Sequence, residues 1–238
     1  MRTTLALRFA AAEQSWGIGN FHRRLTASVP TRSGVVGHLA AALGAHRGQL
    51  PPWLHTLSIF VRVDSPGRLR TDFHTVNPPI DKLIAQRTNI QRLSNLTTEG
   101  DPVLNNKYVA NFVVPNGGGG AWAAGNVPST LVSGRDYLVG AEFIVAISGS
   151  EDQTAQLASA TRTPAFMTYL GRKSCAPRFP YHLGRRDGTP MEVLSTLPTI
   201  GGRDRPLLPV HKISEDHNPA IEYVNPPRAA DISAWSTP

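Results

Sequence analysis

The order in which two kinds of apolar periodicity follow one another most constrains the fold of this 238-residue chain. Three segments alternate apolar and polar residues as half-buried strands do, and a shorter fourth segment also has strand character. They are residues 3–9, 57–64, 135–148 and 165–171. Helical patterns occupy residues 34–43 and 151–161. The order strand, helix, strand, strand, helix, strand predicts an α+β domain of the ferredoxin-like βαββαβ type.

Both predicted helices have recognisable ends. Ser33 is the expected N-cap of the first helix, and Gly44 is its expected stop. The second helix is expected to be capped near Asp152 and to end before Pro164. Two glycines inside the first helix would weaken it in isolation, so it is expected to pack closely on the sheet.

A long segment, from about residue 65 to 134, separates the second and third core strands. It begins with a possible short strand at RTDFHTV and ends in PNGGGGAWAAGNVPS. Compact domains rarely contain loops longer than about 15 residues unless these are functional or disordered. The part from about 77 to 134 is therefore interpreted as an insertion, and a flexible segment without a role is the alternative.

The last part of the chain, residues 172–238, has short strand-like pieces among prolines and glycines. These pieces are MEVLSTL, LLPVHKI and IEYV. They predict a small β-rich C-terminal domain, which follows a larger domain at residues 1–171.

Composition excludes several classes of protein. A hydrophobic content of 40% is enough for a substantial core. No run approaches the roughly 18 apolar residues of a membrane helix, and the N-terminal apolar stretch is too interrupted for a secretory signal, so a cytoplasmic location is expected. The single cysteine, Cys175, excludes an intrachain disulfide and a cysteine zinc cluster, and it is expected to be buried.

Positive charge is concentrated in two places. Residues 1–71 contain nine arginines, no lysine and two acids, and so account for the net charge of +7. A second basic segment begins at Arg172 and continues with Lys173, Arg178, Arg185 and Arg186 before any acid occurs. Separate basic segments favour a localised site for a polyanion, and arginine suits forked recognition of phosphate. The alternative is a solvated surface in an arginine-rich protein.

The stretch PTRSG (30–34), which precedes the first helix, partly resembles a nucleotide-binding loop. A Walker loop needs two glycines, and aligning Arg32-Ser33 with its Lys-Ser places Thr26 and Thr31 at those positions. The match fails, so a mononucleotide-binding enzyme is not supported. A helix start with hydroxyls and a guanidinium can still hold one backbone phosphate, although an ordinary capped helix explains the same residues.

Cations and aromatic residues are interleaved in LGRKSCAPRFPYHLGRR (170–186), and Phe166 and Tyr169 precede it. This mixture suits single-stranded nucleic acid, because phosphates meet the charges and unstacked bases meet the rings. Packing in the core is the alternative for each ring. His74 and His182 could act as general bases in RNA cleavage, but isolated histidines are more often structural.

Several motifs occur in an order that resembles the subtype I-E branch of CRISPR-associated family five, in the RAMP superfamily. They are QSWG, PTRSG, DFHTV, SGRDYL and PAFMTYLGRKSCAP. The resemblance covers most of residues 1–185 and weakens beyond them. Two departures are Ala11-Ala12, where the family usually has Gly-Pro, and a tetraglycine at 117–120 in the long insertion.

The resemblance implies an RNA-recognition-type core, a thumb inserted between core strands and a small C-terminal β domain. It implies a non-catalytic subunit of the antiviral Cascade ribonucleoprotein complex, which caps the 5′ handle of the mature CRISPR RNA (crRNA) and needs no cofactor or metal. The partners implied are the backbone subunit CasC, the large subunit CasA, the small subunit CasB, the repeat endonuclease CasE and, through the complex, target DNA. Relatives in another subtype are metal-independent endoribonucleases that process repeat RNA, and this remains the alternative.

The family's handle contacts carry over to matching positions of this chain. Arg24, Thr31, Arg32 and Ser33 are expected at phosphates. A second group contains Arg172, Lys173 and Ser174, with Phe166 and Tyr169 available for bases and His74 lining the same groove.

Overall fold

The computed structural model describes residues 3–18, 23–76, 114–115, 121–122, 131–200, 207–214 and 220–235. The chain divides into two compact units. The first contains Met1–Asp72 and Arg135–Pro238, and the second is Phe73–Gly134. The predicted insertion at about 77–134 falls within the second unit and lies largely outside the described residues.

A six-stranded sheet forms the centre of the first unit, and all neighbouring strands in it are antiparallel. Its strands, in spatial order, are β11 (His182–Asp187), β1 (Thr3–Ala10), β10 (Glu142–Ser148), β5 (Ser58–Ser65), β13 (Leu208–Ile213) and β14 (Ile221–Val224). The chain is therefore a mixed α+β protein with antiparallel sheets. The strands predicted at 3–9 and 57–64 are confirmed as β1 and β5.

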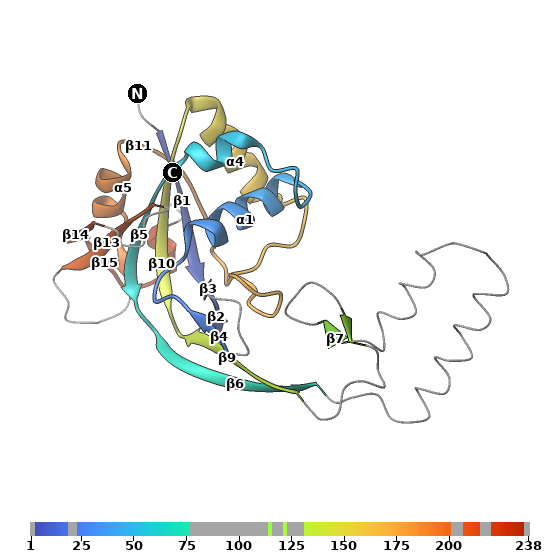
Figure 1. Cartoon of the computed structure of the whole chain (residues 1–238). Helices are drawn as coiled ribbons and strands as arrows, with labels where there is room; N and C mark the ends of the chain where they lie inside the picture. The colour runs from blue at the N-terminus through green and yellow to red at the C-terminus, as the bar shows by residue number, and fades with distance from the viewer. Residues whose placement is uncertain are drawn as a thin grey trace. The chain divides into compact units, whose positions relative to one another are not determined.

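Helices cover both faces of this sheet, as Figure 1 shows. Helices α1 (Arg32–Leu43) and α4 (Glu151–Arg162) pack on one face, over a core that includes Leu5, Leu7 and Phe9 of β1. Helix α5 (Pro190–Thr196) lies on the other face, whose core includes Ala6. The alternation of apolar side chains along β1 thus supplies both cores, because successive residues of a strand point to opposite faces.

The ends of helix α1 follow from local chemistry. The cap is Thr31, not Ser33 as predicted, because the Thr31 hydroxyl accepts a hydrogen bond from the Gly34 amide. The helix ends as predicted at Gly44, which has a φ of 76°. That left-handed conformation is easily adopted by glycine and lets the Gly44 amide satisfy carbonyls of the last turn.

Helix α4 begins at Glu151, as the pattern at 151–161 predicts. Its cap is Ser150, two residues before Asp152, in a capping box with Gln153. Asp152 instead lies in the first turn, where a carboxylate also interacts favourably with the helix dipole.

Three strand predictions need correction. The segment 135–148 forms two strands, β9 (Leu131–Val139) and β10, because Gly140 turns the chain with a φ of 67°. Residues 165–171 form no strand, and β11 takes the outer position beside β1. MEVLSTL forms helix α5, which Thr189 caps in a capping box with Glu192.

A smaller sheet lies beside the central one. It contains β2 (Glu13–Gln14), β9, β4 (Arg23–Thr26) and β3 (Gly17–Ile18), and β6 (Arg68–Val76) pairs with β9. Short pairs are formed by β12 (Thr199–Ile200) with β15 (Arg228–Ala229), and by β7 (Val114–Pro115) with β8 (Ala121–Trp122). Two 3₁₀ helices, η1 (Pro52–Thr56) and η3 (Ile232–Trp235), complete the described elements.

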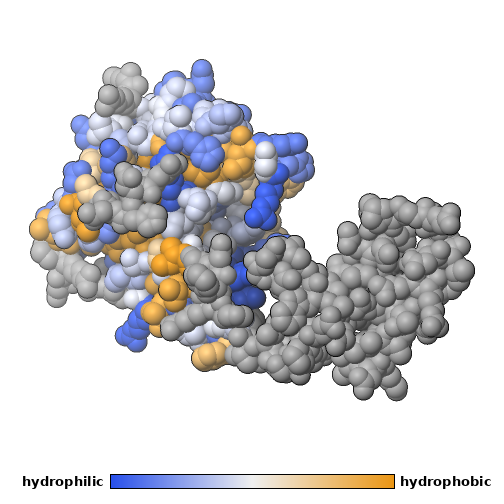
Figure 2. Space-filling model, viewed as in Figure 1, coloured by the Kyte–Doolittle hydropathy of each residue, from blue (hydrophilic) through white to orange (hydrophobic). Residues whose placement is uncertain are grey.

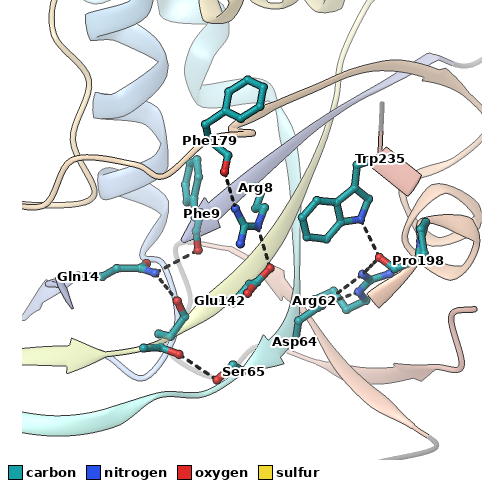
Figure 3. Close-up of polar contacts among 12 residues, drawn as sticks. Arg8, Phe9, Gln14, Arg62, Asp64, Ser65, Glu142, Phe179, Pro198 and Trp235 are labelled. Carbon is teal, nitrogen blue, oxygen red and sulfur yellow. Dashed lines mark hydrogen bonds and ion pairs between the residues drawn. The ribbon is translucent and has the colours of Figure 1, made fainter. Parts of the chain in front are cut away.

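The C-terminal residues are integrated with the central sheet. LLPVHKI and IEYV form β13 and β14, as predicted, and β13 pairs with β5. Strands from both sides of the predicted boundary between residues 171 and 172 therefore share one sheet. Arg62 on β5 connects the same parts, since its buried guanidinium donates to the carbonyls of Leu194, Leu197 and Pro198. Figure 3 shows the contact with Pro198.

Candidate nucleic-acid interface

The segment QSWG (14–17) packs against two motifs that contain cations, PTRSG (30–34) and LGRKS (170–174). A β-carbon on Gly34, at the start of α1, would lie 2.7 Å from the ring of Trp16. A β-carbon on Gly171 would overlap the carbonyl oxygen of Ser15, and the Ser15 amide donates to Leu170 at 3.2 Å. PTRSG and LGRKS, which are far apart in sequence, are therefore both packed against the same few residues.

Trp16 is the fixed element of this arrangement. Its ring is buried and stacks on Phe9 with 5.6 Å between centroids. Its Nε1 donates to the Gln14 side chain, whose own amide donates to the carbonyls of Phe9 and Ala141. The Trp16 backbone binds the Thr26 hydroxyl at the end of β4, so this segment also fixes the strand that carries Arg24.

At the start of α1, the two hydroxyls have different roles. The Thr31 hydroxyl is occupied as the helix cap and is half-buried. The Ser33 side chain is exposed, with its oxygen 3.5 Å from that of Thr31. Ser33 can therefore donate to an external anion near the positive end of the helix dipole, whereas Thr31 mainly shapes the turn.

Arg32 is held within the protein. Its guanidinium donates to the backbone carbonyls of His55 at 2.6 Å, Leu57 at 2.9 Å and Ile213 at 3.2 Å. These contacts join α1 to η1, to the residue just before β5 and to β13. The sequence places this arginine at a phosphate, but most of its hydrogen-bonding capacity serves the fold.

The motif LGRKS forms a tight turn with an exposed lysine at its tip. The Leu170 amide donates to the Cys175 carbonyl, and the Cys175 amide donates to the Arg172 carbonyl, both at 2.8 Å. Lys173 and Ser174, at the tip, are exposed. Cys175 is buried as predicted, and burial raises the pKa of its thiol.

Arg172 is oriented by an aromatic ring of the smaller sheet. Its guanidinium carbon lies 4.7 Å from the centroid of the Tyr137 ring, and Nη1 donates to the Tyr137 hydroxyl at 3.1 Å. Tyr137 belongs to β9, which contains the whole SGRDYL motif (133–138). A stacked guanidinium keeps donors available along its other edge, and it is pre-organised for an anion.

Of the two aromatic candidates, Phe166 lies toward the other end of α1. The Phe166 amide donates to the Ala41 carbonyl in the last turn of this helix, and its ring is 43% exposed and 5.6 Å from that of His46. Tyr169 is half-buried. Because α1 has 12 residues, its two ends are about 16 Å apart. Phe166 is therefore not brought together with the PTRSG residues.

The first basic segment contains arginines that do not reach the surface. Arg8 is nine-tenths buried and pairs with Glu142 at 2.7 Å, and buried Arg62 pairs with Asp64 at 2.7 Å (Figure 3). Arg70 is exposed but also pairs with Glu13. The net charge of residues 1–71 is therefore higher than the positive charge that an external ligand could contact. Asp64, two residues after Arg62, was a signal of such pairing in the sequence.

No helix among the described residues is long and apolar enough to cross a membrane. Within the same residues, no group of three His, Cys, Asp or Glu side chains could hold a metal ion. On the face shown in Figure 2, apolar residues form several separate patches between hydrophilic ones.

Comparison with known proteins gives the family. Residues 4–231 match the family model described as CRISPR-associated protein (Cas_Cas5). The chain belongs to the Cas5 family.

Its relatives agree with this assignment. This Cas5 protein is 28% identical over 219 residues to the CRISPR system Cascade subunit CasD of Escherichia coli (strain K12), covering 85% of this chain and 80% of that one. A chain of a CRISPR RNA-guided surveillance complex is 30% identical, with a TM-score of 0.61 over 88% of this chain and 76% of that one. A Cas protein crystal structure that is 24% identical has a TM-score of 0.63, over 96% of this chain and all of that one, and supports the fold.

Two histidines of this Cas5 protein are fixed by the helices, one within α1 and one beside α4. His38 is buried in α1 and contacts the Tyr181 hydroxyl and the Tyr169 carbonyl, at 3.0 and 3.3 Å. Burial lowers the pKa of His38 to about 4, so the ring is neutral at pH 7. His38 was not among the predicted residues, although a single histidine in an apolar helical stripe was a signal of a buried polar contact.

His182 lies beneath α4. Its Nδ1 is 2.9 Å from the Thr161 hydroxyl, and burial lowers its pKa. The contacts place it beside a helix instead of beside Lys173 or Ser33. Of the remaining predicted residues, Arg24 is exposed on β4, and His74 lies in β6, where the side chains from residue 74 onward are outside the described residues.

Proposed function

We propose that this Cas5 protein is a non-catalytic crRNA-binding subunit of a type I-E Cascade complex and that it holds the 5′ handle of the crRNA. One observation carries the proposal: Trp16 and Ser15 pack against both basic motifs, and exposed polar side chains border this junction. Single-stranded RNA requires several phosphate contacts along a short path. A rigid junction that joins two loops and a helix start is suited to this.

The geometry supports two different roles for the residues that the sequence predicts at phosphates. Ser33, Arg172, Lys173 and Ser174 are proposed to contact phosphates, together with Arg24. Thr31 and Arg32 are proposed to position the helix start, because the first caps it and the second holds three carbonyls. A base contact of Phe166 would be at a separate place along the RNA, because this residue packs at the last turn of α1.

The architecture fits the same proposal. In chain order, β1, α1, β5, β10, α4 and β11 follow the ferredoxin-like βαββαβ pattern of RNA-recognition domains. We interpret the unit Phe73–Gly134 as the thumb and propose that it contacts the backbone subunit CasC. The CasA, CasB and CasE subunits and target DNA would be reached through the assembled complex.

The test is co-purification of the full chain with repeat-derived RNA. The protein is expected to retain a short RNA with one defined 5′ end, and its affinity is expected to fall steeply with salt, because phosphate contacts release counterions. Recovery of RNA ends at random positions, or an affinity that does not respond to salt, would contradict handle binding.

The endoribonuclease alternative is tested in the same preparation. Repeat RNA is incubated with the protein and EDTA, and we expect the RNA to remain intact. Appearance of a handle-terminated product that His182→Gln or His74→Gln abolishes would replace the proposal with metal-independent cleavage. The position of His182 beside Thr161 supports the non-catalytic role.

A further inference from the structure

Phe179 presents an exposed aromatic ring on a fixed backbone. Its side chain is 85% exposed. Its carbonyl accepts a hydrogen bond from Nη1 of Arg8 at 3.3 Å, and Figure 3 shows the ring pointing away from that guanidinium. On either side, the Arg178 amide donates to Ala10 at 2.7 Å and the Tyr181 carbonyl accepts from the Arg8 amide at 2.8 Å. The backbone that carries this ring therefore runs along the end of β1.

The arginine that holds this backbone is itself fixed. Arg8 is nine-tenths buried, its Nε donates to Glu142 at 2.7 Å, and its guanidinium carbon lies 4.8 Å from the centroid of a Trp235 ring. The backbone of Phe179 therefore loses little conformational entropy when the ring binds a partner. An exposed ring on a fixed backbone binds at a lower entropic cost than one on a mobile loop.

The charges nearby indicate the chemistry of that partner. Arg178, directly before the ring, is exposed, and residues 172–186 contain five cations and no acid. Arg185 is engaged by Glu151, which leaves Lys173 and Arg178 as exposed cations on this segment. Cations beside an aromatic face suit a polyanion with flat bases, which is single-stranded RNA.

The Phe179 ring also follows the proposed interface along the chain. Residues 170–178 connect two anchors on one short stretch, since Leu170 is bound to Ser15 and Arg178 to Ala10. A strand of RNA bound at the Lys173 turn would therefore find the Phe179 ring next along the same segment.

We propose that Phe179 stacks on an unpaired base of the bound RNA and that Arg178 contacts a phosphate next to that base. This rests on the proposed RNA-binding function and adds a base contact beyond the predicted candidates Phe166 and Tyr169. Stacking of this kind has little sequence specificity, because every base has an aromatic face.

The test measures affinity of the full-length protein for a fluorescein-labelled single-stranded RNA of the repeat sequence. Phe179→Ala is expected to weaken binding about tenfold with an unchanged salt slope, and Phe179→Trp is expected to retain binding. Arg178→Ala is expected to reduce the slope by about 0.7. Met167→Ala removes another exposed apolar side chain and serves as the control, with no expected effect.

A series of RNAs with one abasic nucleotide each locates the stack. At one position, the abasic RNA is expected to bind wild type and Phe179→Ala equally, because the contact is already lost. Equal binding of intact RNA by both proteins would overturn the inference while leaving the proposed function standing. If Phe179→Ala lost only its association with other Cascade subunits, the ring would be a protein contact. Failure of wild type to bind RNA would instead refute the proposed function and the stack with it.

Discussion

Gly171 lies so close to Ser15 that a β-carbon on Gly171 would overlap the Ser15 carbonyl oxygen. Its φ of 88° also belongs to the left-handed region that favours glycine. The turn that carries Lys173 can therefore approach the QSWG segment only because residue 171 has no side chain. Because Gly34 packs against Trp16 in the same segment, this contact brings LGRKS close to PTRSG.

Gly171→Ala is expected to destabilise the protein by more than about 3 kcal/mol, because backbone must move to admit the new atom. Gly184 is a matched control, since it has the same φ of 88° and nothing within 4 Å of a β-carbon. Gly184→Ala should cost only about 1 kcal/mol, from the backbone conformation alone. Urea denaturation of both variants measures the difference, and equal losses would mean that the contact with Ser15 is unimportant.

Substitution of Arg32 is expected to affect mainly stability, whereas substitution of Lys173 is expected to affect mainly RNA binding. Arg32→Ala should lower the free energy of unfolding by about 3 kcal/mol, because three carbonyls lose a charged donor. Lys173→Ala should leave stability within about 0.5 kcal/mol of wild type and reduce the salt slope of RNA binding by about 0.7.

Arg47, an exposed arginine after α1, is the control for both measurements. Arg47→Ala should change neither stability nor the salt slope. If Arg32→Ala folds with wild-type stability and lowers the slope, Arg32 is a phosphate contact after all.

Arg62 is expected to act inside the protein despite its place in the basic segment. Arg62→Ala should cost about 3–5 kcal/mol, because it leaves Asp64 and three carbonyls without their buried partner. The double variant Arg62→Met with Asp64→Leu should recover part of this loss, since neither charge then remains buried. Thermal unfolding distinguishes these outcomes, and a double variant less stable than the single one would argue against this explanation.

His38 is expected to make the free energy of unfolding depend on pH. Its pKa is about 4 in the folded protein and near 6.5 when exposed, so the unfolded chain takes up the proton first. Stability attributable to His38 is therefore present above about pH 6.5 and is lost as pH falls toward about 4. Between pH 7 and pH 5 the loss should be about 2 kcal/mol.

His38→Gln keeps a polar side chain for Tyr181 and Tyr169 but cannot titrate. The difference in unfolding free energy between wild type and this variant should shrink by that amount between pH 7 and pH 5. A constant difference would show that the proton is not excluded by burial. Other histidines with lowered pKa values contribute equally to both proteins and cancel.

Much of the fold could be predicted because periodicity reports burial directly. The face formed by Leu5, Leu7 and Phe9 is confirmed, and so is the stop at Gly44. The strand expected at 165–171 was wrong because apolar character alone does not distinguish a strand from a turn packed against a helix. β11 was missed since HLGRRD, an edge strand, has few apolar residues to alternate.

The site was less predictable than the fold. Sequence charge cannot distinguish a guanidinium that reaches solvent from one that reaches a carbonyl across the chain, and Arg32 and Arg62 both do the latter. The role of Trp16 was also beyond the sequence, because it depends on how closely Gly34 approaches the ring. Lys173, which the sequence analysis assigns to the second basic segment, is exposed, but its contact with RNA stays a prediction.

The position of β1 in the sheet has a consequence for synthesis of the protein. This apolar strand lies between β10 and β11, which begin at Glu142 and His182. During translation β1 leaves the ribosome long before either neighbour exists, and its edges stay open until most of the chain has been made. Such delayed pairing slows folding and exposes a strand that can aggregate. Yield of soluble protein should therefore depend on chaperones that shield the nascent chain.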